Sequence, residues 1–187
     1  MRVFAALPLS SEIRKFLSDV MDKLGFSYKN LKMVPAASLH ITLHFFGEIS
    51  EEKTEKLRSA LGDPLLTGRI IKASLGGLGF FPARGNPRVI FCTLKEGVEE
   101  VVSFHRTFNE IIYNSGFAVE GEGRSFTPHI TLARNKRGRI DPNFLYSLDL
   151  EQRVFLFDRL ILYQSILRST GAEHRPLKTL IFTREGK

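Results

Sequence analysis

The chain has 187 residues, 43% of them hydrophobic, which is enough for one large domain or two small lobes that share a cleft. No apolar run approaches the ~20 residues of a membrane-spanning helix, and the single cysteine, Cys92, excludes an internal disulfide. The formal net charge of +7 favours an anionic partner such as a nucleic acid or a nucleotide. We therefore expect a cytoplasmic protein without a signal peptide, in which Cys92 is a buried strand residue and not a nucleophile.

The first elements are a strand and a helix. Residues 2–7 are predicted to form a β-strand, and Ser10 or Ser11 is a suitable N-cap for the helix that follows. Apolar residues recur there at helical spacing until Gly25, which we expect to end the helix. The rest of the first half is predicted to form an extended piece over 31–35, a strand over 39–46 ended by Gly47, a helix from Ser50 to Gly62, a strand over 69–75, and a loop or bulged continuation over 76–82.

The second half begins with the same pattern. It is predicted to form a strand over 88–94, a helix closed by Gly116, a strand that follows Phe126, a short helix capped by Asp141 with Pro142 at its first position, long β structure over 153–167, a turn at Gly171, a strand over 177–182, and frayed last residues.

One tetrapeptide occurs twice, as residues 40–43 and 129–132, both reading His-Ile-Thr-Leu. Each half therefore reads strand, helix, motif strand, helix, strand. We expect an α+β fold in which two antiparallel sheets with flanking helices are related by a pseudo-two-fold axis and meet at a central cleft lined by the two His-x-Thr strands. The chain is expected to be a single bilobal domain over 1–187, with a first repeat over about 1–80 and a second over about 85–183.

The repeated tetrapeptide supplies candidate catalytic residues. Side chains at i and i+2 of a strand share a face, so His40 lies beside Thr42 and His129 beside Thr131. Two imidazoles on opposite sides of a phosphate can serve as general acid and general base, because the histidine pKa is near 6.5. The threonine hydroxyls can donate hydrogen bonds to the non-bridging oxygens. This arrangement suits in-line displacement at phosphorus.

Two alternatives compete with that interpretation. A single His-x-Thr in a strand is often structural, although folding alone preserves Ile and Leu more naturally than His and Thr. A metal site is disfavoured, because His44 lies about 13 Å along the strand from His40 and neither motif contains a carboxylate. We therefore expect no metal and no cofactor. His44 is predicted to lie on the same strand face as His40, at the cleft rim, as a substrate contact or a solvated residue. His105 is predicted in or near the core and His174 at the surface.

Basic and aromatic residues near the motifs are candidates for substrate contacts. Arg134 and Arg137 follow the second motif directly, and Arg84 lies in a Gly/Pro loop just before Arg88. These guanidinium groups can hold phosphates through charge-assisted hydrogen bonds. Phe126 can stack on a base. The predicted partner is RNA or a related nucleotide.

The residues in and around both motifs resemble the two-histidine (2H) phosphoesterases, in particular the RNA 2′,3′-cyclic phosphodiesterase branch, historically called 2′-5′ RNA ligases. The resemblance spans nearly the whole chain and rests on residues 2–6, 39–47, 80–82, 87–89 and 126–134. Two positions depart from it: Met33 stands where relatives often have Trp, and His174 where a Tyr is common.

The resemblance implies a bilobal α+β fold and an enzyme that opens a terminal 2′,3′-cyclic phosphate to a 2′-phosphomonoester without metal. His129 matches the family's proton acceptor and His40 its proton donor. Thr42 and Thr131 match the phosphate-binding positions, and Arg134 matches an arginine common after the second motif. Alternatives are 2′-5′ RNA ligation, action on a small cyclic nucleotide such as ADP-ribose 1″,2″-cyclic phosphate, and an RNA-binding module without catalysis. We expect a monomer.

Overall fold

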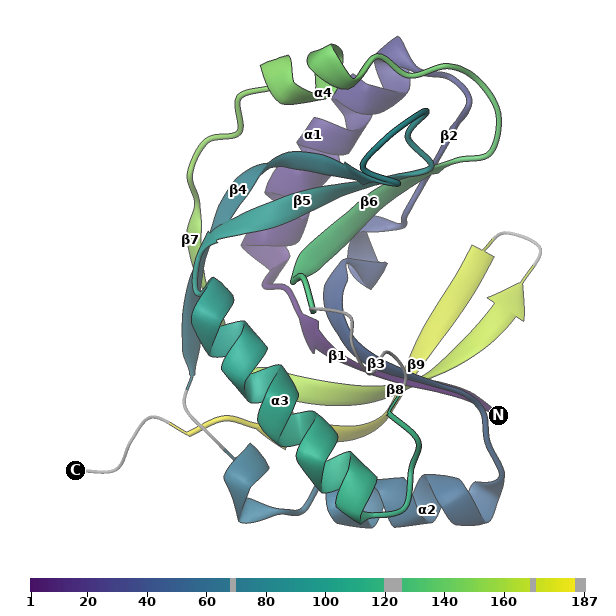
Figure 1. Cartoon of the computed structure of the whole chain (residues 1–187), viewed down its shortest axis with the longest axis vertical. Coiled ribbons are helices and arrows are strands. Elements are labelled where there is room, and N and C mark those ends of the chain that lie inside the picture. The colour runs from purple at the N-terminus through teal and green to yellow at the C-terminus, as the bar shows by residue number, and fades with distance from the viewer. Residues whose placement is uncertain (68–69, 120–125, 169–170, 184–187) are drawn as a thin grey trace.

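One curved antiparallel sheet forms the frame of the molecule in the computed structural model, which describes residues 1–67, 70–119, 126–168 and 171–183 (Figure 1). Within these residues the sheet has nine strands in the order β7-β4-β5-β6-β3-β1-β8-β9, and β2 pairs with β6 outside this path. The strands are β1 (Arg2–Pro8), β2 (Leu31–Met33), β3 (His40–Glu48), β4 (Ile71–Phe81), β5 (Val89–Glu96), β6 (His129–Asn135), β7 (Val154–Phe157), β8 (Arg159–Arg168) and β9 (Gly171–Ile181).

Helices cover the two ends of this sheet. In Figure 1, α1 lies across the back of the half that contains β4, β5 and β6, whereas α2 and α3 lie at the other half. The helices of the described ranges are α1 (Ser11–Ser27), α2 (Glu51–Ala60), α3 (Val98–Asn114) and α4 (Pro142–Ser147), with single 3₁₀ turns η1 (Ala36–Ser38) and η2 (Pro64–Leu66). No helix in these ranges is long and apolar enough to cross a bilayer.

The α+β class predicted from the sequence is confirmed, and the two expected sheets are joined into one through β3 and β6. The chain also exchanges strands between its sequence halves. β4 comes from the first half but pairs with β5 and β7, and β8 comes from the second half but pairs with β1. Each half of the sheet is thus built from both halves of the sequence.

Helix α1 begins as predicted but runs past its predicted end. The Ser10 hydroxyl accepts a hydrogen bond from the Ile13 amide at 3.3 Å, which is an N-cap contact. The prediction that Gly25 ends the helix is wrong, because the helix continues to Ser27. Tertiary contacts explain the extension: the ring of Tyr28, the C-cap, packs edge-on against Phe144 at 5.3 Å.

Two glycine-containing segments stay in the sheet. The predicted strand end at Gly47 is wrong, because β3 continues to Glu48 and Gly47 pairs with Val3 at a register shift, with a φ of +69°. Residues 76–81 are a bulged continuation of β4. A Cβ at Gly79 would lie 2.6 Å from the Phe91 ring. The absence of a side chain at Gly79 therefore gives Phe91 its place against the motif strand β6.

The long β structure predicted over 153–167 divides at Asp158. β7 before it pairs with β4, and β8 after it pairs with β1 and β9, so the two strands join different halves of the sheet. β9 begins at Gly171 and not at 177, because it pairs with β8 along its whole length. The predicted fraying of the last residues falls on 184–187, outside the described residues.

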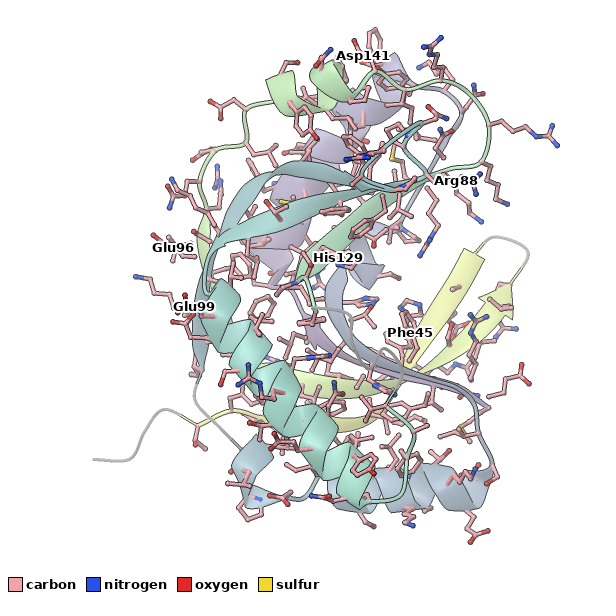
Figure 2. The ribbon with its side chains drawn as sticks, in the orientation of Figure 1. Phe45, Arg88, Glu96, Glu99, His129 and Asp141 are labelled. Atoms are coloured by element: carbon pink, nitrogen blue, oxygen red, sulfur yellow. The ribbon has the colours of Figure 1, made fainter. Side chains whose placement is uncertain are left out.

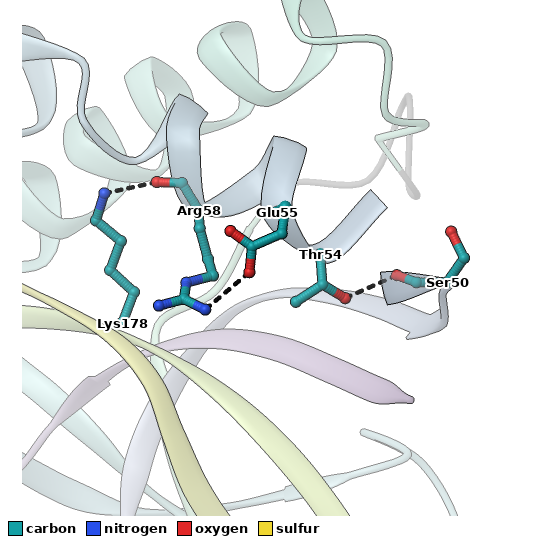
Figure 3. A network of polar contacts seen from close by, with 5 residues as sticks. All are labelled: Ser50, Thr54, Glu55, Arg58 and Lys178. Carbon is teal, nitrogen blue, oxygen red and sulfur yellow. Dashed lines mark hydrogen bonds and ion pairs between the residues drawn. The ribbon is translucent and has the colours of Figure 1, made fainter. Parts of the chain in front are cut away.

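Helix α2 is fixed to the sheet by polar contacts (Figure 3). The Thr54 hydroxyl donates to the Ser50 carbonyl at 2.8 Å in the first turn, and Arg58 pairs with Glu55 at 2.8 Å. Lys178 of β9 donates to the Arg58 carbonyl at 2.6 Å, where the helix leaves carbonyls without helical partners. This contact ties the end of α2 to β9.

Candidate active site

The two motif strands meet at the centre of the sheet. β3 and β6 pair antiparallel at Ile41 and Ile130, whose side chains are both fully buried. Continued by one residue on each side, this register brings His40 toward Thr131 and His129 toward Thr42. Cross-strand neighbours in such a pair have Cβ atoms ~5 Å apart. The fold therefore gathers two imidazoles and two hydroxyls on one face of the sheet.

The motif strands share an irregularity one residue further on. The register between β1 and β3 skips Leu43, and the register between β5 and β6 skips the equivalent Leu132. An extra residue in one strand shifts the alternation of side chains that follow it. The next residues, His44 and Ala133, are consequently buried in both copies.

The residues after the bulges return to the cavity face. Phe45 pairs with Phe4, and the Phe4 ring lies 5.1 Å from His40. Arg134 holds the same position in β6 and is exposed. Figure 2 shows His129 and Phe45 on facing halves of the molecule. The repeat thus places an aromatic ring in one half where the other half has a guanidinium.

A backbone carbonyl fixes the His40 ring. Its Nδ1 lies 2.6 Å from the Ser38 carbonyl oxygen and its Nε2 lies 3.0 Å from the Thr42 hydroxyl. A carbonyl only accepts hydrogen bonds, so Nδ1 carries a proton. In the neutral ring, Nε2 then accepts from the Thr42 hydroxyl, and in the protonated ring Nε2 can donate a proton.

The second histidine repeats this arrangement. The Nδ1 of His129 donates to the Thr127 carbonyl at 2.8 Å, again two residues before the ring. The ring is held between Phe81 and Phe91, at 5.3 and 5.1 Å between centroids. Its Nε2 therefore carries the lone pair in the neutral form, as a general base requires.

The surroundings of His40 oppose protonation. Burial lowers the pKa of His40 from 6.5 to about 4, and charge repulsion from His174 and His129 acts in the same direction, whereas the Ser38 carbonyl opposes it. The His174 ring stands edge-on to the His40 ring at 5.5 Å, and Tyr163 lies at 6.4 Å. Burial also lowers the pKa of His174. His40 is thus neutral near pH 7 in the unliganded protein.

A single cavity of about 1320 Å³ contains these groups. Its lining includes the two motif histidines and both motif threonines together with residues from β1, α3 and β9, among them Phe4, Phe45, His105, Asn109, Arg134 and His174. In the described ranges, no group of three or more His, Cys, Asp or Glu residues is arranged to hold a metal ion. Cys92 is fully buried as predicted, and burial raises its pKa to about 12.

Comparisons with known proteins agree with this geometry. The family model described as the 2′-5′ RNA ligase superfamily matches residues 10–166. The chain belongs to this superfamily. The resemblance to 2H phosphoesterases seen in the sequence is therefore confirmed.

Relatives of the superfamily carry consistent names. A Thermus thermophilus protein named RNA 2′,3′-cyclic phosphodiesterase is 36% identical over 139 residues, which cover 73% of this chain and 69% of that protein. An Archaeoglobus fulgidus protein of the same name is 32% identical over 137 residues, covering 73% and 74%. The crystal structure of the Thermus thermophilus protein TT0787 superposes with a TM-score of 0.76 at 28% identity over the whole of both chains.

The predicted substrate contacts of this superfamily member fall into three groups. Arg134 and Phe126 line the central cavity, but Phe126 stacks on His105 at 3.7 Å with an interplanar angle of 6°. Arg84 lines a separate hollow at the outer end of β6. Arg137 is exposed and lines neither the cavity nor that hollow.

Two histidine predictions are corrected. His44 was expected on the face of His40 at the cleft rim. It does border the central cavity, but it is only 6% exposed, and the bulge at Leu43 shifts it off the strand face that carries Thr42. His174 was expected at the surface, but it borders the cavity beside His40. No local pattern indicates this, because the position of His174 depends on the long-range pairing of β1, β8 and β9.

Proposed function

We propose that this chain is an RNA 2′,3′-cyclic phosphodiesterase that hydrolyses a terminal 2′,3′-cyclic phosphate to a 2′-phosphomonoester. The observation that carries the proposal is the matched orientation of the two histidines. Each Nδ1 is bonded to a carbonyl two residues earlier, and both rings border one cavity. The Nε2 atom of each ring is thereby the nitrogen that can transfer a proton, and that of His40 accepts from the Thr42 hydroxyl in the neutral ring. The names of the relatives support the same substrate class.

The reaction assigns one proton transfer to each histidine. The Nε2 of His129 takes a proton from water as the water oxygen forms a bond to phosphorus. The bond from phosphorus to the ribose 3′ oxygen breaks on the opposite side, and the Nε2 of His40 gives its proton to that oxygen. Thr42, Thr131 and Arg134 stabilise the charge that builds on the non-bridging oxygens. The products are a 2′-phosphomonoester and a free 3′ hydroxyl.

Substrate binding supplies the protonation state that this assignment needs. His40 is neutral in the unliganded protein, because burial lowers its pKa to about 4. A phosphodiester anion beside the ring favours the imidazolium and raises the pKa. The protonated Nε2 can then donate to the leaving oxygen, with Nδ1 still held by Ser38. In this proposal, the anionic substrate itself charges the general acid.

The test is turnover of an oligonucleotide that ends in a 2′,3′-cyclic phosphate, in the presence of a chelator. We expect 2′-phosphate ends, identified by ³¹P NMR, and their loss in His40→Ala and His129→Ala proteins. Tight binding without turnover would instead indicate an RNA-binding module, and activity abolished by the chelator would indicate a metal enzyme. Parallel reactions with an added 5′-hydroxyl RNA and with ADP-ribose 1″,2″-cyclic phosphate test ligation and small cyclic substrates.

The proposal includes the setting in which the enzyme acts. A monomer suffices, because His40, Thr42, His129 and Thr131 all come from one chain and border one cavity. A reducing cytoplasm suits a protein whose single cysteine is fully buried. Sedimentation of the purified protein tests the first statement, and cell fractionation tests the second.

A further inference from the structure

A second hollow lies beyond the central cavity, at the outer end of β6. Its volume is about 890 Å³, and it is bordered by the loop between β4 and β5 and by the residues that end β6 and follow it. Figure 2 shows Arg88 of this loop toward the outer end of the molecule, beyond His129. Three of the lining residues are cations and none is an acid: Pro82, Arg84, Asn86, Arg88, Asn135 and Lys136.

Hydrogen bonds hold the two walls of this hollow together. Asn135 is 8% exposed, and its amide nitrogen donates to the carbonyls of Pro87 at 2.9 Å and Gly138 at 3.0 Å. Asn86 also donates to the Gly138 carbonyl, at 2.8 Å, and its side-chain oxygen accepts from the Ile140 amide at 3.0 Å. These hydrogen bonds hold the β4–β5 loop and the residues after β6 in one fixed arrangement, and the basic residues of the hollow are carried by these two segments.

Within the part of the chain that the structure describes, the cations of the hollow have no carboxylate partners. Among the described residues, no ion pair involves Arg84, Arg88 or Lys136. Other arginines of the chain do pair with Asp or Glu, namely Arg58, Arg153, Arg159, Arg168 and Arg175. Like charges gathered without counter-charges destabilise a fold unless an anion binds between them. The hollow therefore has the electrostatic character of an anion site.

Basic residues connect this hollow to the central cavity. Lys136 lines both, and Arg134 of the same strand lines the central cavity. Arg134 stands directly opposite Lys32 of β2, which also lines the central cavity. Like charges in directly opposite positions of an antiparallel pair are unfavourable. A line of cations thus leads outward along β6 from His129.

We infer that this hollow is a second anion site that binds backbone phosphates of an RNA strand whose cyclic 3′ end occupies the central cavity. The inference rests on the proposed function for the identity of the strand. Lys136 follows His129 by seven residue steps, which span up to ~23 Å in extended chain. That span exceeds one nucleotide, so the second site engages phosphates several nucleotides before the end. The substrate is then an oligonucleotide. A mononucleotide would occupy the central cavity but not the second site.

The experiment compares kcat/KM for 2′,3′-cyclic substrates of increasing length: a mononucleotide, a dinucleotide, a tetramer and an octamer. The test protein carries Arg84→Gln and Arg88→Gln together. The matched control carries Lys15→Gln and Lys23→Gln, which remove two exposed positive charges from α1. Thermal unfolding of all proteins verifies that each variant is folded.

We expect kcat/KM to rise with length in the wild type and in the control. In the test protein, the ratio of octamer to mononucleotide kcat/KM should fall about tenfold. The salt dependence of octamer binding should also weaken, by ~0.7 in log–log slope for each phosphate that the variant no longer neutralises. An equal fall of the ratio in the control, or no length dependence in the wild type, would overturn the inference.

Failure of the proposed function gives a different result. A protein that turns over no cyclic substrate of any length contradicts the proposed function alone. The second site is then judged by fluorescence anisotropy with a labelled octamer that ends in a 2′-phosphate. Weaker binding by the Arg84→Gln/Arg88→Gln protein than by the control supports the site, and equal binding by both contradicts it.

Discussion

The two halves of the central cavity share a strand pattern and differ in what surrounds it. In both motifs, the Nδ1 of the histidine donates a hydrogen bond to the carbonyl two residues earlier, and the strand has a bulge three residues later. His40 is enclosed by Phe4, Tyr163 and His174, whereas the rings beside His129 are phenylalanines. Only the first environment places a further titratable imidazole against the ring.

This difference shows which part of the sequence sets which property. The repeated tetrapeptide and its bulge set geometry, because they act through backbone register alone. The surroundings of His40 set its protonation, because burial, and after it repulsion from His174 and from His129, lower the pKa of His40. A duplicated strand can therefore supply a symmetric pair of groups, and its unequal neighbours can assign them unequal roles.

The largest effect should come from removing either histidine. We expect His40→Asn and His129→Asn each to lower kcat/KM on a cyclic-ended oligonucleotide by ~10²–10⁴-fold, since each substitution abolishes one proton transfer. Steady-state kinetics measures this, and thermal unfolding verifies the fold. If a variant of either position retained most of the wild-type activity, His40 and His129 would not act together as general acid and general base.

A second prediction concerns stability and pH. The pKa of His40 is about 4 in the folded protein and 6.5 in the unfolded chain, so between these values the unfolded chain binds a proton that the folded protein does not. The free energy of unfolding should therefore fall as the pH falls from 6.5 to 4. In His40→Asn, this pH-dependent loss of stability should be smaller by about 2 kcal/mol. The figure is less than the full pKa difference would give, because the His40 ring is partly exposed and solvent screens its charge.

Urea unfolding at pH 7 and at pH 4.5 measures this difference. The matched control is His105→Asn, because burial lowers the pKa of His105 as well but this ring comes from α3 and not from a motif strand. The His40 variant should show the weaker pH dependence of the two. Identical profiles for the wild type and His40→Asn would contradict the role of burial at this ring.

Arg134 and Phe45 occupy equivalent positions and should respond differently. We expect Arg134→Gln to raise KM about tenfold for a cyclic-ended oligonucleotide, because a charge-assisted hydrogen bond to phosphate is worth ~1.5 kcal/mol or more. Phe45→Leu, which removes no charge, should change KM less. Kinetics of the two proteins in one buffer tests the comparison. The reverse order of effects would show that the Phe45 half of the cavity holds the phosphate.

The smallest effect should come from His174. Its charge is one of the causes that lower the pKa of His40, after burial, so His174→Gln should raise the pKa of His40 in the unliganded protein. NMR titration of the His40 ring measures this shift. An unchanged or lowered pKa would show that His174 does not act on His40 through its charge.

The sequence predicted those parts of the molecule that local patterns encode. The Ser10 cap, the Asp141–Pro142 helix start and the buried Ile41 and Ile130 follow from residue type and spacing. The gathering of both motifs in one cavity was expected because the tetrapeptide is repeated. The mixed α+β class followed from the alternation of strand and helix patterns.

Long-range pairing decided what the sequence did not predict. The exchange of β4 and β8 between halves of the sheet has no local signal, and neither has the division of 153–167 at Asp158. The face of His44 depends on a bulge opposite Ala5, which strict alternation cannot reveal. His174 reaches the cavity only through the pairing of β8 with both β1 and β9.

The central claim is that the rings of His40 and His129 flank one phosphorus atom. A crystal structure of the protein with a nucleoside 2′-monophosphate, the proposed product at its shortest length, tests this most directly. We predict one phosphate in the central cavity. The Nε2 of His129 should lie within hydrogen-bond distance of a phosphate oxygen, and the Nε2 of His40 within hydrogen-bond distance of the 3′ hydroxyl. A phosphate bound to one ring only, with the other too far away to contact the nucleotide, would contradict the account.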